Sequence, residues 1–227
     1  MRIADRLDAV RASIAAAAAA CGRDSATVGL LAVSKRFPAS AVLEAQAAGQ
    51  QAFGENRVPE FVDKARELAG HDLDWHFVGS VQTNKVRDLV GVEGLALLHS
   101  LDRAKLADRL QAALDEIDGR LRVLIQVNAT GEGQKHGVLP DDVDSLVEHV
   151  RSACPRLELR GFMGMGPLEG DPTPVFERIA RLRTEAEQQI GGELPELSLG
   201  MTGDLEQAVA AGSTLVRVGT GVFGPRA

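Results

Sequence analysis

The chain has 227 residues, of which 44% are hydrophobic and 25% are charged, and this composition is typical of a globular protein with one large core. The net charge is −7, from 25 basic and 32 acidic side chains, which argues against general nucleic-acid binding because that needs a basic surface. The two cysteines, Cys21 and Cys154, form no CxxC pair and have no histidine at metal-ligand spacing. We therefore expect two ordinary thiols in a reducing cytoplasm, with neither a disulfide nor a metal site.

The chain opens with a helical pattern. Ile3, Leu7 and Ile14 recur at helical spacing, which predicts an amphipathic N-terminal helix. Asp5 and Asp8 stand where a secretory signal peptide would need basic residues, so we expect no signal peptide. No run of about 18 apolar residues occurs, so we expect no membrane span.

Short apolar runs then alternate with helical patterns up to the end of the chain. Eight runs separated by helices predict a single (β/α)8 TIM-type barrel, with a doubly wound open sheet as the alternative. No linker or low-complexity segment interrupts the pattern, so we expect one domain over residues 1–227. The eight runs are 28–34, 50–55, 74–79, 94–100, 122–128, 157–165, 196–201 and 214–219.

Lys35 directly follows the first apolar run. In a TIM barrel the active site lies at the carboxyl ends of the strands, which is where this lysine falls. Partial desolvation favours a neutral amine, and a neutral amine can form a Schiff base with an aldehyde. The alternative is a lysine that extends its charge to solvent. Polar residues at the ends of other runs, such as Asn56 after the second, favour a functional site.

The seventh and eighth runs end in loops that suit a phosphate group. The seventh ends in Gly-Met-Thr-Gly-Asp around Thr202, and the eighth continues into Gly219, Thr220 and another glycine. Glycines let backbone N–H groups approach an anion, and this is the usual phosphate position of the fold. The alternatives are a helix cap at Thr202 and a tight turn at Gly219.

The expected site has a lysine at one end, which can capture an aldehyde, and two phosphate-binding loops at the other. These features indicate that its ligand is a phosphorylated carbonyl compound. Pyridoxal 5'-phosphate (PLP) fits, and so does a sugar phosphate handled by a Schiff-base aldolase. Arg217 lies in the eighth run, between the lysine and the phosphate loops. It favours PLP, because PLP sites commonly use an aspartate or an arginine as the partner of the pyridine nitrogen.

Several motifs resemble the YggS/PROSC family of PLP homeostasis proteins, over nearly the whole chain. They include LLAVSK, which ends at Lys35, and FGENRVPE, WHFVGSVQTNK, LSLGMTGDLEQAV and VRVGTGVFG, which begin at residues 53, 75, 197 and 216. The resemblance implies the barrel of the alanine racemase N-terminal domain. It also implies a role in buffering PLP or delivering it to PLP-dependent apoenzymes, without robust catalysis.

The resemblance assigns roles to individual residues as well. Lys35 should carry the PLP Schiff base and Arg217 should face the pyridine nitrogen. Thr202, Gly219 and Thr220 should hold the phosphate. Asn56 and Met165 should line the pocket near the cofactor.

The sequence departs from relatives at Arg57 and His136, whose roles the sequence does not define. Lys135 is either a rim residue that handles PLP in transit or a solvated lysine.

The rival hypothesis is a PLP-dependent amino-acid racemase or a related enzyme of the same fold. Racemases of this fold resemble two-base enzymes that use a lysine and a tyrosine, and the chain contains no tyrosine. The sequence ends directly after the eighth run, so we expect neither the second domain of a racemase nor its dimer contacts. We therefore expect a monomeric carrier with no catalytic residues.

Overall fold

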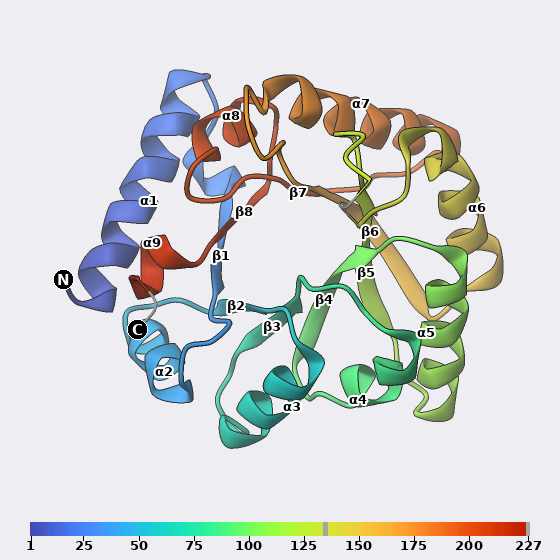
Figure 1. Ribbon diagram of the computed structural model, residues 1–227, viewed down its shortest axis with the longest axis horizontal. Helices are drawn as coiled ribbons and strands as arrows, with labels where there is room; N and C mark the ends of the chain where they lie inside the picture. The colour runs from blue at the N-terminus through green and yellow to red at the C-terminus, as the bar shows by residue number, and fades with distance from the viewer. Residues whose placement is uncertain (134–135, 226–227) are drawn as a thin grey trace.

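The structure, a computed structural model, describes residues 1–133 and 136–225 and contains a closed barrel of eight strands (Figure 1). Each strand pairs in parallel with the next along the chain, and the last pairs with the first to close the barrel. The predicted (β/α)8 barrel is confirmed, and the alternative of an open sheet is wrong. The strands are β1 (Gly29–Val33), β2 (Ala52–Glu55), β3 (Asp74–Phe77), β4 (Leu95–Leu101), β5 (Leu121–Val127), β6 (Leu157–Gly164), β7 (Glu196–Ser198) and β8 (Leu215–Val218).

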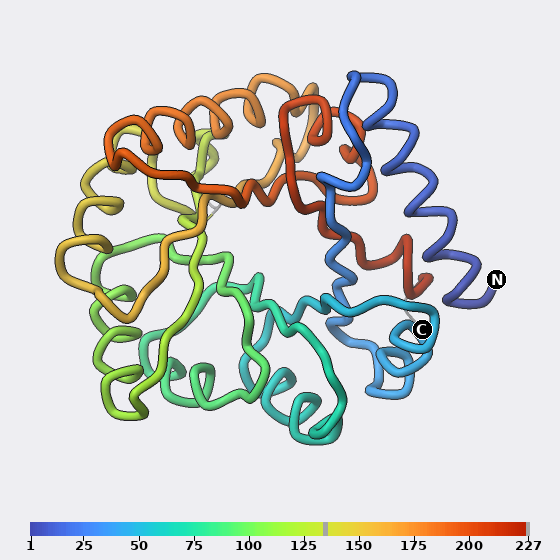
Figure 2. Tube along the Cα trace, turned by 180° about the vertical axis from the view of Figure 1, so that it is seen from behind, coloured from blue at the N-terminus to red at the C-terminus, as the bar shows by residue number. Residues whose placement is uncertain are grey.

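Helices surround the barrel, and the expected N-terminal helix is α1 (Ile3–Ala20). It packs beside α2, α8 and α9, as the view from behind also shows (Figure 2). The remaining helices are α2 (Ala39–Ala47), α3 (Val58–Glu67), α4 (Val86–Val90), α5 (Ala104–Glu116), α6 (Val143–Ala153), α7 (Thr173–Ile190), α8 (Leu205–Ala210) and α9 (Thr220–Phe223), with short 3-10 turns η1 (Ser25–Thr27), η2 (Thr83–Lys85) and η3 (Pro140–Asp142).

The main hydrophobic core lies between the strands and the helices. Trp75 of β3 packs there between two phenylalanines, with ring centroids 6.0 Å from Phe53 and 5.5 Å from Phe61. A separate small cluster of three side chains occupies the barrel interior: Leu97, Leu124 and Met163. Both faces of the strands are therefore buried, which explains why the strands read as continuous apolar runs.

Several strands are shorter than their apolar runs, and β7 differs most from its run. The seventh run reaches Met201, but β7 ends at Ser198. Gly200 has a φ of +83°, a left-handed conformation that an extended strand does not contain. The chain therefore leaves the sheet early and begins the loop before α8.

None of the helices in the described ranges combines the length and the apolar character needed to cross a bilayer.

Candidate functional site

A cavity of about 430 Å³ lies at the carboxyl ends of the strands. Apolar side chains from four parts of the barrel contribute to its wall, namely Val33, Val78, Met163 and Met201. All the residues that the sequence assigned to the site line this one cavity: Lys35, Asn56, Met165, Thr202, Arg217, Gly219 and Thr220. The structure thus brings together residues that are distributed over nearly the whole chain, while their individual roles stay predictions.

Lys35 stands in a tight turn directly after β1. The turn is closed by the Phe37 N–H, which donates to the carbonyl of Ser34 at 3.0 Å. Arg36 within the turn has a φ of +65°, a left-handed conformation that costs roughly 1–2 kcal/mol for a residue other than glycine. The Arg36 N–H donates to the Glu60 carboxylate, which helps to hold this conformation. The turn fixes where the half-buried Lys35 side chain leaves the backbone.

A buried ion pair lies beside this turn. Glu55, at the end of β2, is fully buried and pairs with Lys64 of α3, which is only 6% exposed. The Lys64 ammonium also donates to the carbonyl of Ser34 at 2.9 Å, and the Ser34 hydroxyl donates to Glu55 at 2.7 Å. Burial raises the pKa of Glu55, and the positive charge of Lys64 opposes that rise. The residue before Lys35 is therefore held by both members of the pair.

Sequence reasoning missed this pair, although one signal for it exists. Lys64 follows Phe61 by three positions and precedes Leu68 by four, so it lies on the apolar face of α3. A lysine on such a face needs a buried partner. The sequence alone does not identify Glu55 as that partner.

Arg217 lies in the barrel interior and is only 5% exposed. Its guanidinium donates to the Ser198 carbonyl at 2.6 Å, to the Ser198 hydroxyl at 2.8 Å and to the Gly164 carbonyl at 2.8 Å. Burial lowers the pKa of Arg217 to about 10, so the side chain stays protonated at neutral pH. Because β8 pairs with β1, Arg217 and Lys35 reach the cavity from neighbouring strands.

Two histidines extend this hydrogen-bonded chain across the barrel. The Ser198 hydroxyl lies 3.0 Å from Nδ1 of His99, and Nε2 of His99 lies 2.9 Å from Nδ1 of His76. Burial lowers the pKa of His76 to about 4 and that of His99 well below its usual value. Both imidazoles are therefore neutral at pH 7.

The positions of the protons in this series of hydrogen bonds follow from which groups can donate and which can accept. Arg217 can only donate, so Ser198 accepts from it and has its own hydroxyl proton to give. Among the described residues, His99 Nδ1 is the acceptor within reach. His99 then carries its proton on Nε2 and donates to His76. His76 and His99 fall in the third and fourth apolar runs, but the sequence gives no indication that they are connected to Arg217.

The two loops of the predicted phosphate site approach one another. A Cβ atom at Gly221 would lie 3.5 Å from the Thr202 hydroxyl and 2.7 Å from a Val218 methyl group. A distance of 3.5 Å is ordinary van der Waals contact, so the two loops lie against one another, and the clash that a larger residue at 221 would make is with Val218 of β8. The hydroxyl-bearing residues Thr202 and Thr220 are exposed at the cavity.

Asn56 and Met165 follow β2 and β6, where both line the cavity. The position of Asn56 depends on Gly79, because a Cβ atom at Gly79 would lie 2.0 Å from the Asn56 carbonyl oxygen. The two residues whose roles were open, Arg57 and His136, line a neighbouring cavity of about 680 Å³. Lys135 lies outside the described residues.

Comparison with known proteins identifies the family. The model of the alanine racemase N-terminal domain family matches residues 6–227. The chain is 45% identical to the pyridoxal phosphate homeostasis protein of Pseudomonas aeruginosa, over 99% of this chain and 96% of the relative. It is 44% identical to the protein of the same name from Escherichia coli, over 99% of this chain and 97% of that one. The chain belongs to the family of pyridoxal phosphate homeostasis proteins.

A solved structure supports this assignment. PipY of Synechococcus elongatus, in its structure with PLP bound, is 36% identical and superposes with a TM-score of 0.85 over 98% of this chain and all of PipY. The resemblance to PLP homeostasis proteins is confirmed, and so is the barrel of the alanine racemase N-terminal domain type.

Proposed function

We propose that this chain binds PLP covalently through Lys35 and acts in PLP homeostasis, by buffering the cofactor or delivering it to PLP-dependent apoenzymes. The observation that carries the proposal is the single cavity that unites Lys35, Arg217 and the two loops at Thr202 and Thr220. Relatives at 45% and 44% identity bear the name of PLP homeostasis proteins, and a relative at 36% identity is known with PLP bound.

The residues of the cavity fit the cofactor. A volume of about 430 Å³ falls within the range of about 300–1,000 Å³ that small-ligand pockets occupy. Threonine hydroxyls and glycine backbone at the two loops suit a phosphate group, and Met163 and Met165 offer an apolar surface to an aromatic ring. When bound, PLP supplies an aldehyde that an amine can attack and a ring nitrogen that can accept a hydrogen bond.

The protein's own groups then have distinct tasks. Lys35 provides the amine that forms the carbon–nitrogen linkage, with loss of water. Arg217 faces the ring nitrogen and keeps its proton, because its pKa of about 10 is well above neutral pH. Its three hydrogen bonds to Ser198 and Gly164 fix the plane of the guanidinium before the ligand arrives. Thr202, Gly219 and Thr220 hold the phosphate.

The cavity favours a carrier over a racemase. Among the described residues that line it, Lys35 and Arg217 are the titratable ones. Racemisation needs proton transfer on both faces of the substrate, and arginine does not serve as a base at neutral pH. The chain also contains no tyrosine to supply the second base. We therefore propose a carrier with at most weak catalysis, and the alternative function is a PLP-dependent racemase.

In this proposal the chain acts as a single domain over residues 1–227, as a monomer and in the cytoplasm. The free thiols Cys21 and Cys154 are compatible with a reducing compartment. Light scattering coupled to gel filtration tests the monomer directly.

The first experiment is a visible absorption spectrum of the purified protein before and after borohydride, followed by peptide mass mapping. We expect bleaching of the cofactor band and a reduced pyridoxyl group on Lys35. The Lys35→Ala variant should lose the adduct, whereas Lys85→Ala, a lysine of the neighbouring cavity, should keep it. A protein that stays colourless with added PLP, or an adduct that persists in Lys35→Ala, contradicts the proposal.

A second experiment separates the carrier from the enzyme. The PLP-loaded protein is mixed with an apoenzyme whose activity reports PLP uptake, and it is assayed in parallel for racemisation of amino acids. Gain of apoenzyme activity without racemisation supports the carrier. Racemisation that disappears in the Lys35→Ala variant would support the alternative.

A further inference from the structure

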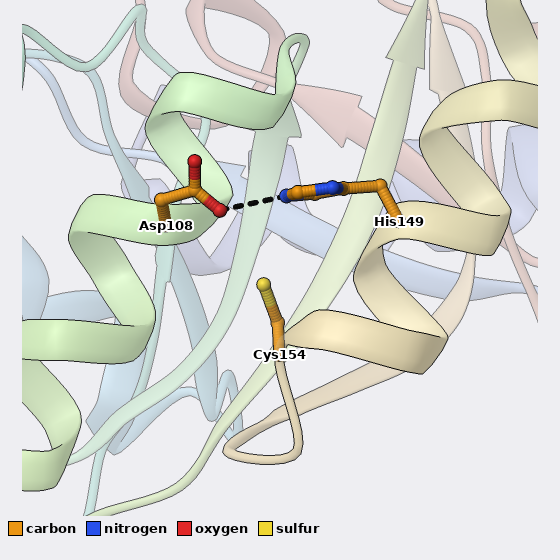
Figure 3. Close-up of side chains that lie close together, drawn as sticks. All are labelled: Asp108, His149 and Cys154. Carbon is orange, nitrogen blue, oxygen red and sulfur yellow. Dashed lines mark hydrogen bonds and ion pairs between the residues drawn. The ribbon is translucent and has the colours of Figure 1, made fainter.

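Three potential metal ligands meet on the outer face of the barrel, between α5 and α6 (Figure 3). Asp108 comes from α5, His149 from α6, and Cys154 from the residue that ends α6. Nε2 of His149 lies 2.7 Å from Oδ1 of Asp108. In Figure 3 the Cys154 sulfur points toward this contact, and one ligand atom of each residue lies within 4.8 Å of the others.

The cluster is separate from the cavity that contains Lys35. Helix α6 leads into β6, so its last residues lie near the amino end of that strand. The cavity lies at the carboxyl ends of the strands, on the opposite side of the barrel. Metal binding at Cys154 is therefore independent of the PLP proposal.

Cys154 is held more firmly than Asp108 and His149. Backbone hydrogen bonds fix Cys154 on both sides, from its own N–H to Val150 at 3.1 Å and from the Leu157 N–H to its carbonyl at 2.9 Å. The thiol is buried. The Asp108 side chain is 58% exposed and His149 is 32% exposed, so both can adjust their rotamers. A fixed sulfur with two adjustable neighbours lets the three ligands close around an ion.

We propose that Asp108, His149 and Cys154 form a binding site for Zn²⁺, with water as the fourth ligand. Sulfur, imidazole nitrogen and carboxylate oxygen are the ligands of Zn²⁺, whereas Mg²⁺ and Ca²⁺ prefer oxygen alone. A thiolate and a carboxylate together balance the charge of the ion. Zinc bonds of roughly 2.0–2.3 Å place tetrahedral ligand atoms roughly 3.3–3.8 Å apart. The Asp108 oxygen and the His149 nitrogen, now 2.7 Å apart, therefore have to separate slightly, which the exposed Asp108 side chain can do by rotation.

Binding of Zn²⁺ requires that Cys154 lose its thiol proton and that Nε2 of His149 lose its proton. Burial raises the pKa of Cys154 to about 11, and Asp108 contributes to that rise, so the metal-free residue is a thiol at neutral pH. When the zinc–sulfur bond forms, the thiol proton leaves to solvent. The proton on Nε2 of His149 exchanges with solvent, so that Nδ1 carries the ring proton and Nε2 is free for the ion. The protonated thiol also argues against a catalytic cysteine at this position.

The sequence did not reveal this site. It predicted no metal site because no histidine was counted as a metal partner of either cysteine, although His149 precedes Cys154 by five positions, a spacing that zinc ligands can have. The structure instead joins His149 and Cys154 to Asp108, which lies far away in the sequence and reaches them only through the packing of α5 against α6.

The test is a Co²⁺ titration of the full-length, chelator-treated protein, read in the visible and near ultraviolet as difference spectra. We expect one bound Co²⁺ per chain, with the strong visible bands of tetrahedral cobalt and a thiolate charge-transfer band, both removed by added Zn²⁺. Zn²⁺ should also raise the melting temperature. Cys154→Ser should lose the charge-transfer band, and His149→Ala should lose tetrahedral binding.

The chain offers matched controls. Cys21→Ser removes the other cysteine, which is exposed, and His71→Ala removes an exposed histidine outside the cluster. Both variants should bind Co²⁺ as the unchanged protein does. Because replacing the buried Cys154 can impair folding, Asp108→Asn is the decisive variant. It keeps an acceptor for His149 but removes the charge, and it should weaken Co²⁺ binding at least about tenfold. Absence of a thiolate band in the unchanged protein, or its loss in Cys21→Ser, would overturn the proposal.

Discussion

Arg217 and Ser198 are joined twice, since one guanidinium nitrogen donates to both the hydroxyl and the carbonyl oxygen of the serine. The arginine can therefore neither rotate nor withdraw without breaking two bonds in the barrel interior. Ser198 belongs to β7 and Arg217 to β8, so the position of the guanidinium is set by the pairing of two neighbouring strands. The PLP-binding role proposed for Arg217 depends on this support.

We expect Ser198→Ala to weaken PLP binding while leaving the covalent linkage to Lys35 intact. The substitution removes one hydrogen bond to the guanidinium, which contributes about 1–1.5 kcal/mol, or roughly a fivefold to tenfold change in affinity. The measurement is a titration of the metal-free apoprotein with PLP. Ser213→Ala is the matched control, because Ser213 is equally buried and its hydroxyl bonds to backbone atoms of β7, of the loop after it and of β8. Equal loss of affinity in both variants would mean that the effect is general destabilisation.

The histidine pair makes the stability of the protein dependent on pH. Burial lowers the pKa of His76 to about 4 from a usual value of 6.5, so the unfolded chain binds more protons than the folded protein between these values. The free energy of unfolding should accordingly be highest above about pH 6.5 and fall as the pH drops toward about 4. His99 should act in the same direction, because burial lowers its pKa as well.

Melting temperatures measured from pH 7 to pH 4 check this expectation. The unchanged protein should lose stability steeply across that range, and His76→Gln should lose less, whatever its stability at pH 7. His71→Gln, at an exposed position, should keep the steep dependence. An identical slope in His76→Gln would show that other groups control the acid sensitivity.

The parts of the molecule that the sequence predicted correctly are those with local signals. The eight strands were recognisable as apolar runs, and the positions of Lys35 and Thr202 at strand ends were recognisable because both residues follow such runs directly, while their roles stay predictions. In a closed parallel barrel every strand end faces the same mouth, so local position was enough to bring these residues into one cavity.

The parts that the sequence did not predict depend on contacts between distant segments. The bonds from His76 through His99 to Ser198 cross the barrel interior, and which side chains meet there depends on the stagger of the strands. The contact of Asp108 with His149 depends on how two helices pack. Apolar periodicity indicates which face of an element is buried, but not which polar side chain will lie opposite.

The buried pair of Glu55 and Lys64 leads to a prediction about stability. Lys64→Met leaves the carboxylate of Glu55 buried beside the turn at Lys35 without its ion-pair partner, and it should cost about 3–5 kcal/mol in the free energy of unfolding. The double variant Lys64→Met/Glu55→Gln should recover much of that loss, because no buried charge remains. Urea denaturation measures both.

Arg66→Met, which breaks an exposed pair with Asp63 on the same helix, should change stability very little. A small effect of Lys64→Met would show that Glu55 is protonated or reached by water.

Gly79→Ala should disturb the cofactor site from outside the cavity. The new methyl group would lie 2.0 Å from the Asn56 carbonyl oxygen, so the chain at the ends of β2 and β3 has to separate. Because Asn56 lines the cavity, we expect weaker PLP binding together with a loss of roughly 1–3 kcal/mol in stability. PLP titration and urea denaturation measure the two effects. Gly133→Ala is the control, since a Cβ atom there meets no described atom within 4 Å. Unchanged PLP affinity in Gly79→Ala would mean that Asn56 does not contribute to holding the cofactor, and the assignment of that residue to the site would then be wrong.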